Sequence, residues 1–191
     1  MALGRHGGAS QFINVANGKL NVTVDGQRES FDFYDGRLVG IQLIEDEWEG
    51  QPVAKVQLTM EDDSGERVKI KFGQETWYSY GFFARIGNVD LSLPFTLGVM
   101  PSEQNEKISF CWMRQGGKIE ADKENTPRPE KVKRGKKTIT DWQGFNEFAE
   151  RTVSNIAASL GAPVPAGESY PPPPTDADYE PYDDEDSALP F

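Results

Sequence analysis

Alternating polar and apolar residues, divided into short runs by turn dipeptides, dominate the first 72 residues. Residues 19–24 place Leu20, Val22 and Val24 on one face of an extended strand, and residues 52–60 repeat this pattern. Three dipeptides typical of β-hairpin turns separate such runs: Asn17-Gly18, Asp25-Gly26 and Asp35-Gly36. Short strands joined by tight turns predict a mainly β architecture with antiparallel pairing.

Residues 67–72 carry the sharpest alternation in the chain. Successive side chains of a strand point to opposite faces, so one face is apolar and the other is basic. The apolar face holds Val68, Ile70 and Phe72, and the basic face holds Arg67, Lys69 and Lys71. This strand is expected to cover a core with one face and to meet solvent or an anionic ligand with the other.

Two segments break the strand pattern and predict helices. Thr76 can cap a short helix that runs to residue 86, and Gly87-Asn88 can end it, with a strand over the same residues as the alternative. Aromatic residues are concentrated in this segment: Trp77, Tyr78, Tyr80, Phe82 and Phe83. Between the two helices, strands are expected over 91–100 and 107–118, the second with its inward set at Ile108, Phe110 and Trp112.

The second predicted helix spans residues 140–160 and is amphipathic. Thr140 and Gln143 form a capping-box pair at its start, and Gly161 and Pro163 follow its end. Its apolar stripe recurs at helical spacing and is expected to pack on the sheet: Trp142, Phe145, Phe148, Ala149, Val153, Ile156 and Leu160.

The rest of the chain divides by composition. Residues 1–10 are Gly-rich and are expected to form a flexible arm, and residues 11–160 are expected to form one domain. Inside that domain, residues 121–137 lack apolar periodicity and predict a basic loop. Residues 161–175 contain four consecutive prolines and predict an extended linker, and residues 176–191 predict a disordered acidic tail.

Charge is unevenly distributed, which matters for the choice of partner. The chain holds 31 acidic and 20 basic residues, for a net charge of −11. Eight of the acidic residues and none of the basic ones lie in 168–191, so the first 167 residues hold 23 acidic and 20 basic residues. The body is therefore nearly neutral, and its clustered basic residues remain compatible with an anionic ligand.

Residue types that support metal or redox chemistry are scarce. Cys111 is the single cysteine and His6 the single histidine, so a disulfide framework or a Cys-rich zinc site is excluded. We expect Cys111 to be a small strand residue, and we expect no cofactor and no metal. No apolar run reaches transmembrane length and no signal peptide is visible, which predicts a soluble cytoplasmic protein without membrane partners.

The last ten residues carry the most specific motif. Four consecutive acidic residues precede a short spacer and an apolar end that offers a ring and a carboxylate: Asp183, Asp184, Glu185, Asp186, then Leu189, Pro190 and Phe191. An apolar slot with a Lys or Arg at its mouth would capture such an end, so these residues are expected to bind partner proteins. The acidic run would speed the encounter with a basic surface.

This tail resembles the C-terminal tip of bacterial and phage single-stranded DNA-binding proteins, more closely the phage-encoded ones. Alternation alone fits several β architectures, whereas the resemblance implies an OB-fold-like small antiparallel barrel. It also implies protection of single-stranded DNA in replication, recombination and repair, recruitment of replication and repair proteins through the tip, and the cytoplasm of a bacterial host. It covers the tail and the order of segments, and no motif of the body.

Single-stranded DNA requires cations along a path for phosphates and flat side chains for nucleobases. Three regions supply them: the basic face of the 67–72 strand, the aromatic segment after it, and the basic loop with two residues before it. The expected contacts are Arg67, Lys69, Lys71, Trp77, Tyr78, Arg114, Lys118, Arg128, Lys131, Lys133, Arg134, Lys136 and Lys137. Trp48 is left out, because acidic neighbours surround it.

Other functions remain open on the sequence. The chain can be a non-catalytic adaptor of a replication complex, with the basic loop binding an acidic partner instead of DNA. Acidic runs at 45–47 and 61–63 are residue types that could bind Mg²⁺ for nuclease chemistry. They fall at strand ends and turns, where solvated acids are ordinary, and we expect no enzyme activity. The tail can also dock weakly on the protein's own basic groove until DNA displaces it.

Overall fold

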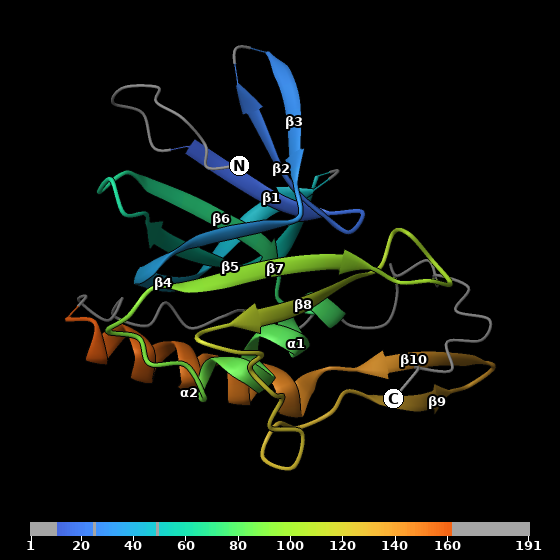
Figure 1. Cartoon of the computed structure of the whole chain (residues 1–191). Helices are drawn as coiled ribbons and strands as arrows, with labels where there is room; N and C mark the ends of the chain where they lie inside the picture. Colours follow the sequence, from blue (N-terminus) through green and yellow to red (C-terminus); the bar gives the residue numbers. More distant parts are fainter. Residues whose placement is uncertain (1–10, 25, 49, 162–191) are drawn as a thin grey trace.

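The computed structural model describes residues 11–24, 26–48 and 50–161, and places ten strands and two helices within them (Figure 1). The first six strands are β1 (Gln11–Ala16), β2 (Lys19–Val24), β3 (Gln27–Phe31), β4 (Phe33–Trp48), β5 (Gln51–Glu61) and β6 (Arg67–Gly73). The other elements are α1 (Trp77–Ile86), β7 (Phe95–Pro101), β8 (Ser109–Arg114), β9 (Glu130–Arg134), β10 (Lys137–Asp141) and α2 (Gln143–Ser159). The predicted arm, the linker beyond residue 161 and the tail lie outside the described residues.

Eight strands form one curled sheet in the order β3-β2-β1-β6-β5-β4-β7-β8. All pairings are antiparallel except that of β1 with β6, which is parallel. The curl brings the β1–β2 turn to the far end of the sheet, where the amide of Gly18 donates to the hydroxyl oxygen of Ser109 at 2.9 Å. The predicted mainly β class is confirmed, as a half-barrel sheet with two helices.

Strand β4 is long enough to pair with two neighbouring strands, one after the other. Its first residues pair with β7 and its later ones with β5, and a β-bulge between Leu38 and Gly40 interrupts the β5 pairing shortly after the change of partner. Bulges bend a strand and increase its twist, which lets one strand turn the corner of the half-barrel.

One predicted turn is therefore wrong: Asp35 and Gly36 lie inside β4. Gly36 is required for close packing instead, since a Cβ there would stand 2.7 Å from the carbonyl oxygen of Glu61. A glycine at a close approach of two chains gives the same sequence signal as a glycine in a hairpin turn.

The core fills the inside of the curl. Val56, Leu58 and Met60 of β5 are fully buried, as are the apolar residues of β6, so the inward faces predicted for these two strands are confirmed. Helix α1 lies beneath β6 and β8 (Figure 1). It begins as predicted, because the Thr76 side chain accepts from the amide of Ser79 at 3.1 Å.

The inward face predicted for the 107–118 strand is wrong by one residue. Cys111 and Met113 of β8 point into the core, at 2% and 0% exposure, and contact α1. Phe110 and Trp112 therefore lie on the outer face of the sheet. The pattern was ambiguous because both faces of this strand carry apolar side chains. β7 starts at Phe95, after a turn over 91–94.

Helix α2 packs its predicted stripe against β4 and α1, burying Phe145, Ala149, Val153 and Ile156. Its cap differs from the prediction: Thr140 belongs to β10, and the Asp141 carboxylate accepts from the amide of Gln143 at 2.9 Å. Gly161, at φ +71°, follows the helix end. Neither described helix has the length and apolar character needed to cross a membrane.

Candidate nucleic-acid interface

The outer face of the sheet carries the basic residues predicted on β6. Because Val68, Ile70 and Phe72 point inward, Arg67, Lys69 and Lys71 point to the opposite side. The pairing of β6 with β5 continues this face through Glu61, Thr59 and Gln57. The strand thus presents three cations in a line, as the sequence predicts.

An aromatic ring that the sequence analysis missed lies among these cations. Phe12 of β1 pairs in register with Lys69 and is 47% exposed, because Ile13 takes the inward position. The ammonium nitrogens of Lys69 and Lys71 lie 5.4 Å and 4.9 Å from the centre of the Phe12 ring. We call Phe12, Lys69 and Lys71 the Phe12 cluster. The alternation around Ile13 could have revealed the outward ring, but nothing local predicts that β1 pairs with β6.

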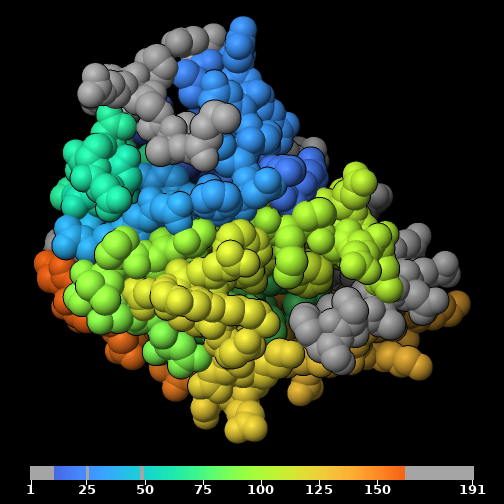
Figure 2. Space-filling model, viewed as in Figure 1, coloured from blue at the N-terminus to red at the C-terminus, as the bar shows by residue number. Residues whose placement is uncertain are grey.

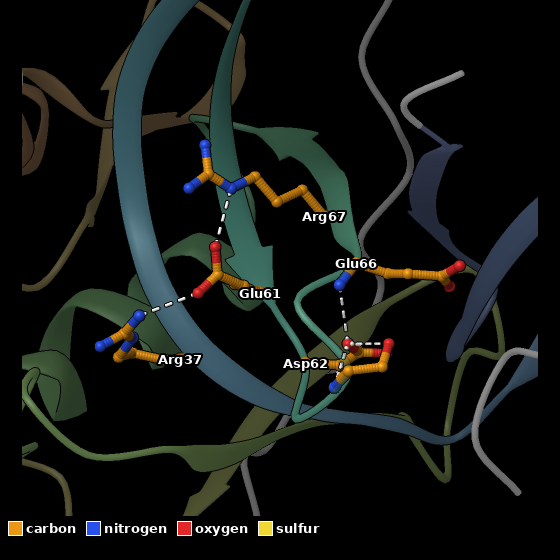
Figure 3. Close-up of polar contacts among 6 residues, drawn as sticks. Arg37, Glu61, Asp62, Glu66 and Arg67 are labelled. Carbon is orange, nitrogen blue, oxygen red and sulfur yellow. Dashed lines mark hydrogen bonds and ion pairs between the residues drawn. The ribbon is translucent and has the colours of Figure 1, made fainter. Parts of the chain in front are cut away.

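Some of the cations predicted on β6 form ion pairs with carboxylates of nearby strands. Glu61 lies between two guanidinium groups and accepts from Arg37 and from Arg67, each at 2.8 Å (Figure 3). The hydrogen bond from Arg67, followed by that from Arg37, lowers the pKa of Glu61 below its ordinary value. The same row therefore holds two positive charges and one negative charge.

The two lysines of the Phe12 cluster differ in their pairing. Asp46 accepts from Lys55 at 2.9 Å and lies 3.8 Å from the Lys71 ammonium, and the Lys55 contact is the main cause of its lowered pKa. Within the described residues, no carboxylate lies within ion-pair distance of Lys69. Lys69, which is half-buried, is thus the cation of this strand that has no carboxylate partner among the described residues.

The two aromatic residues predicted to contact DNA, Trp77 and Tyr78, mainly pack against other side chains of the protein. Tyr78 is 1% exposed and packs its ring on Phe72 at 4.9 Å between centroids, so the prediction that it stacks on a nucleobase is wrong for this conformation. Burial is also the main reason that the pKa of Tyr78 is raised. Trp77 is half-buried against Trp142 and Tyr80, at the seam of the two helices. A helix that must cover the open end of the core uses its aromatic residues for that purpose.

The predicted basic loop contains a second, two-stranded sheet. β9 and β10 pair antiparallel around Gly135 at φ +64°, so the expectation of a structureless 121–137 segment is corrected. The cross-strand pair of Val132 and Ile139, both half-buried, explains the strand structure. In Figure 1 this hairpin lies beyond β8, on the helical side of the sheet. We call residues 130–141 the basic hairpin.

The hairpin carries its predicted cations at the surface. Lys131 and Lys133 point to the same face as Thr138 and Thr140, and Lys136 lies in the turn. The hairpin residues predicted to contact DNA are all exposed: Lys131, Lys133, Arg134, Lys136 and Lys137. Arg128, also exposed, precedes the hairpin. These positions form a basic arm that is separate from the outer face of the sheet.

The two remaining predicted contacts lie at the end of β8. The Arg114 guanidinium lies 5.2 Å from the centre of the Trp112 ring, and Lys118 is ion-paired with Glu120 at 3.1 Å. The predicted residues therefore fall in four regions: β6, helix α1, the end of β8, and the basic hairpin with Arg128 before it. The predicted partner-binding residues 183–186 and 189–191 lie outside the described residues.

The described residues hold no group of three or more His, Cys, Asp or Glu side chains placed to bind a metal ion. Of the acidic runs considered for Mg²⁺, Glu61 is held by two arginines, and Asp62 accepts from the backbone and hydroxyl of Ser64 and from the amide of Glu66 (Figure 3). Comparison with protein-family models, curated proteins and solved structures finds no match to this chain.

Proposed function

We propose that this chain binds single-stranded DNA, largely without sequence preference, on the outer face of its curled sheet. The observation that carries the proposal is the Phe12 cluster: a half-exposed ring beside two ammonium groups on the outer face of the sheet. Every nucleobase has a flat face that can stack on such a ring, and its neighbouring phosphates can pair with the lysines. Neither contact depends on base identity.

The strand connections support an OB-type barrel as the scaffold. β4 is bent and pairs antiparallel with both β5 and β7, α1 lies between β6 and β7 in sequence, and β8 pairs with β7. This is the order of the five OB strands, with β4 as the first. OB-folds bind oligonucleotides on the face of their second and third strands, which correspond here to β5 and β6. A fold alone does not specify function, so the proposal depends on the cluster on that face.

The parallel pairing of β1 with β6 adds to this scaffold. In an OB barrel the third strand closes against the fifth, whereas here β1 and β2 continue the sheet from β6, and their turn reaches Ser109. This addition places Phe12 beside the lysines of the third strand. The N-terminal strands would thus provide the stacking ring of the face.

The test is a titration of a fluorescently labelled oligo-dT with the full chain, read by anisotropy over a salt series. We expect Phe12→Ala to weaken binding by ~1–3 kcal/mol, the value of one stacked base. Lys69→Gln is expected to weaken binding most at low salt and to reduce the slope of log K against log salt by ~0.7, the value for one phosphate contact on a single strand. Lys107→Gln, an exposed lysine in the turn before β8, is the matched control.

The outcomes separate the two functions left open by the sequence. Salt-dependent binding that both substitutions weaken supports the proposal. If the full chain does not bind oligo-dT at low salt, the DNA-binding proposal is contradicted and the adaptor function is favoured. Recruitment of replication and repair proteins through residues 176–191 remains a proposal from sequence, supported by their acidic and aromatic composition.

A further inference from the structure

A second aromatic surface lies on the outer face, at the β8 end of the sheet. Phe33 of β4, Gly98 of β7 and Trp112 of β8 stand opposite one another in a single row. Phe33 is 43% exposed, and its ring centre lies 6.2 Å from that of Trp112. Phe110 and Met100 form the next outward pair, and Met100 is 45% exposed. We call Phe33, Gly98, Met100, Phe110, Trp112 and Arg114 the Trp112 strip.

Gly98 fixes the position of the indole. A Cβ at this residue would lie 1.9 Å from Cε2 and 2.2 Å from Cζ2 of Trp112, so the ring occupies the space directly over the glycine. The φ of Gly98 is not in the left-handed region, so its backbone does not itself require glycine. The missing side chain is explained by the ring that lies on it. Arg114 then places a guanidinium 5.2 Å from that ring.

The strip and the Phe12 cluster share one surface. Between them run the outward residues of β6, β5 and β4, where Arg67, Glu61 and Arg37 form a crosswise row with a net positive charge (Figure 3). Strands β4, β7 and β8 continue this surface in Figure 2 as adjacent blue, green and yellow bands. From strand spacing and rise, Phe12 and Trp112 lie roughly 30 Å apart along the sheet.

We propose that the Trp112 strip is a second stacking platform for the same single strand of DNA. Phe33 and Trp112 take a nucleobase, and Arg114 takes a phosphate. This inference rests on the proposed function and adds a second contact site and a path between the two. The combination of rings with an adjacent cation repeats that of the Phe12 cluster, and this repetition favours a nucleic acid over an apolar protein contact.

One acidic residue lies on this path. Asp35 stands on β4 between Arg37 and Phe33 on the outer face, and its carboxylate accepts from the hydroxyl of Thr96. An Asn at this position can keep the hydrogen bond while removing the charge. A DNA strand that crosses from one platform to the other passes this position, so Asp35→Asn is expected to tighten binding at low salt.

The experiment measures oligo-dT affinity and the number of nucleotides that one protein occludes at saturation. Trp112→Ala and Phe33→Ala are each expected to weaken binding roughly 5- to 150-fold, the equivalent of one stacked base, and to shorten the occluded length. Trp112→Phe restores a ring and is expected to recover most of the lost affinity. Gly98→Ala pushes the indole away and is expected to act like Trp112→Ala. Gly117→Ala, with nothing within 4 Å of its new Cβ, is the control.

Each outcome decides between the alternatives. If the wild-type chain does not bind oligo-dT, the proposed function fails and this inference with it. If the wild type binds and Phe12→Ala weakens it, while both strip variants bind with unchanged affinity and occluded length, only the second platform is overturned. If Trp112→Ala instead converts a dimer to a monomer in sedimentation at unchanged occluded length, the strip is a contact between copies, which also overturns the inference.

Discussion

Two glycines determine how closely side chains and backbone approach on this sheet. Gly36 lets β4 pass the carbonyl oxygen of Glu61, and Gly98 makes room for the Trp112 ring. Neither has the left-handed φ that usually explains a glycine in a β protein. At the residue scale, the sequence therefore shows a glycine at each position but does not reveal that close packing requires it. For this reason the Asp35-Gly36 pair predicts a hairpin turn although it lies inside β4.

Gly36→Ala is the corresponding stability prediction. The new methyl group would overlap the Glu61 carbonyl and approach the Tyr34 ring at 3.0 Å, so the strand must shift. We expect the free energy of unfolding in urea to fall by ~1–3 kcal/mol. Gly87→Ala is the control, because its Cβ meets nothing within 4 Å, and it should change stability by no more than ~0.5 kcal/mol. Equal stabilities of the two variants would contradict this account of Gly36.

At the element scale, strands with one apolar face were predictable and strands with two were not. Val68, Ile70 and Phe72 fixed the inward face of β6, since their neighbours are charged. β8 carries apolar residues on both of its faces. Packing against α1 decides that the face with Cys111 and Met113 points into the core. The strands of the basic hairpin could not be predicted for another reason. A cationic segment with a single cross-strand apolar pair shows little alternation of apolar and polar residues. The Phe12 and Trp112 surfaces depend on strand pairing, which no local pattern contains.

The basic hairpin makes its own testable contribution to binding. Lys131→Gln together with Lys133→Gln removes two exposed cations from one face of β9 and leaves the Val132–Ile139 pair in place. If both contact phosphates, the slope of log K against log salt should fall by ~1.4 for single-stranded DNA. Thermal unfolding should be unchanged, because both side chains are exposed. An unaltered slope would mean that the hairpin lies off the DNA path.

At the scale of the whole molecule, charge is divided between a nearly neutral body and an acidic C-terminal segment. Residues 176–191 hold seven acidic residues and no basic one. If this segment docks on the protein's own basic groups, it would compete with phosphates for them at a high effective concentration. The net charge of −11 is therefore a poor guide to whether the chain binds DNA. The basic clusters on the sheet and on the hairpin are the surfaces that would make the contacts.

Deletion of residues 176–191 is accordingly expected to tighten oligo-dT binding at low salt. The gain should shrink as salt rises, since screening weakens attraction between exposed charges. Anisotropy titrations of both chains at three salt concentrations would measure it. A charge-neutral replacement of the seven acidic residues by Asn and Gln, at full length, controls for chain length. Identical affinities across the series would rule out this competition.

Photochemical cross-linking can test the proposal that single-stranded DNA lies along the outer face of the sheet. An oligo-dT that carries iodouracil would be bound to the full chain, irradiated and mapped by mass spectrometry. Cross-links are expected at Phe12 and at Phe33 or Trp112, because Phe12 and Phe33 are exposed and Trp112 is partly exposed. Cross-links found only on the basic hairpin or on α2, with none on β1, β4 or β8, would contradict it.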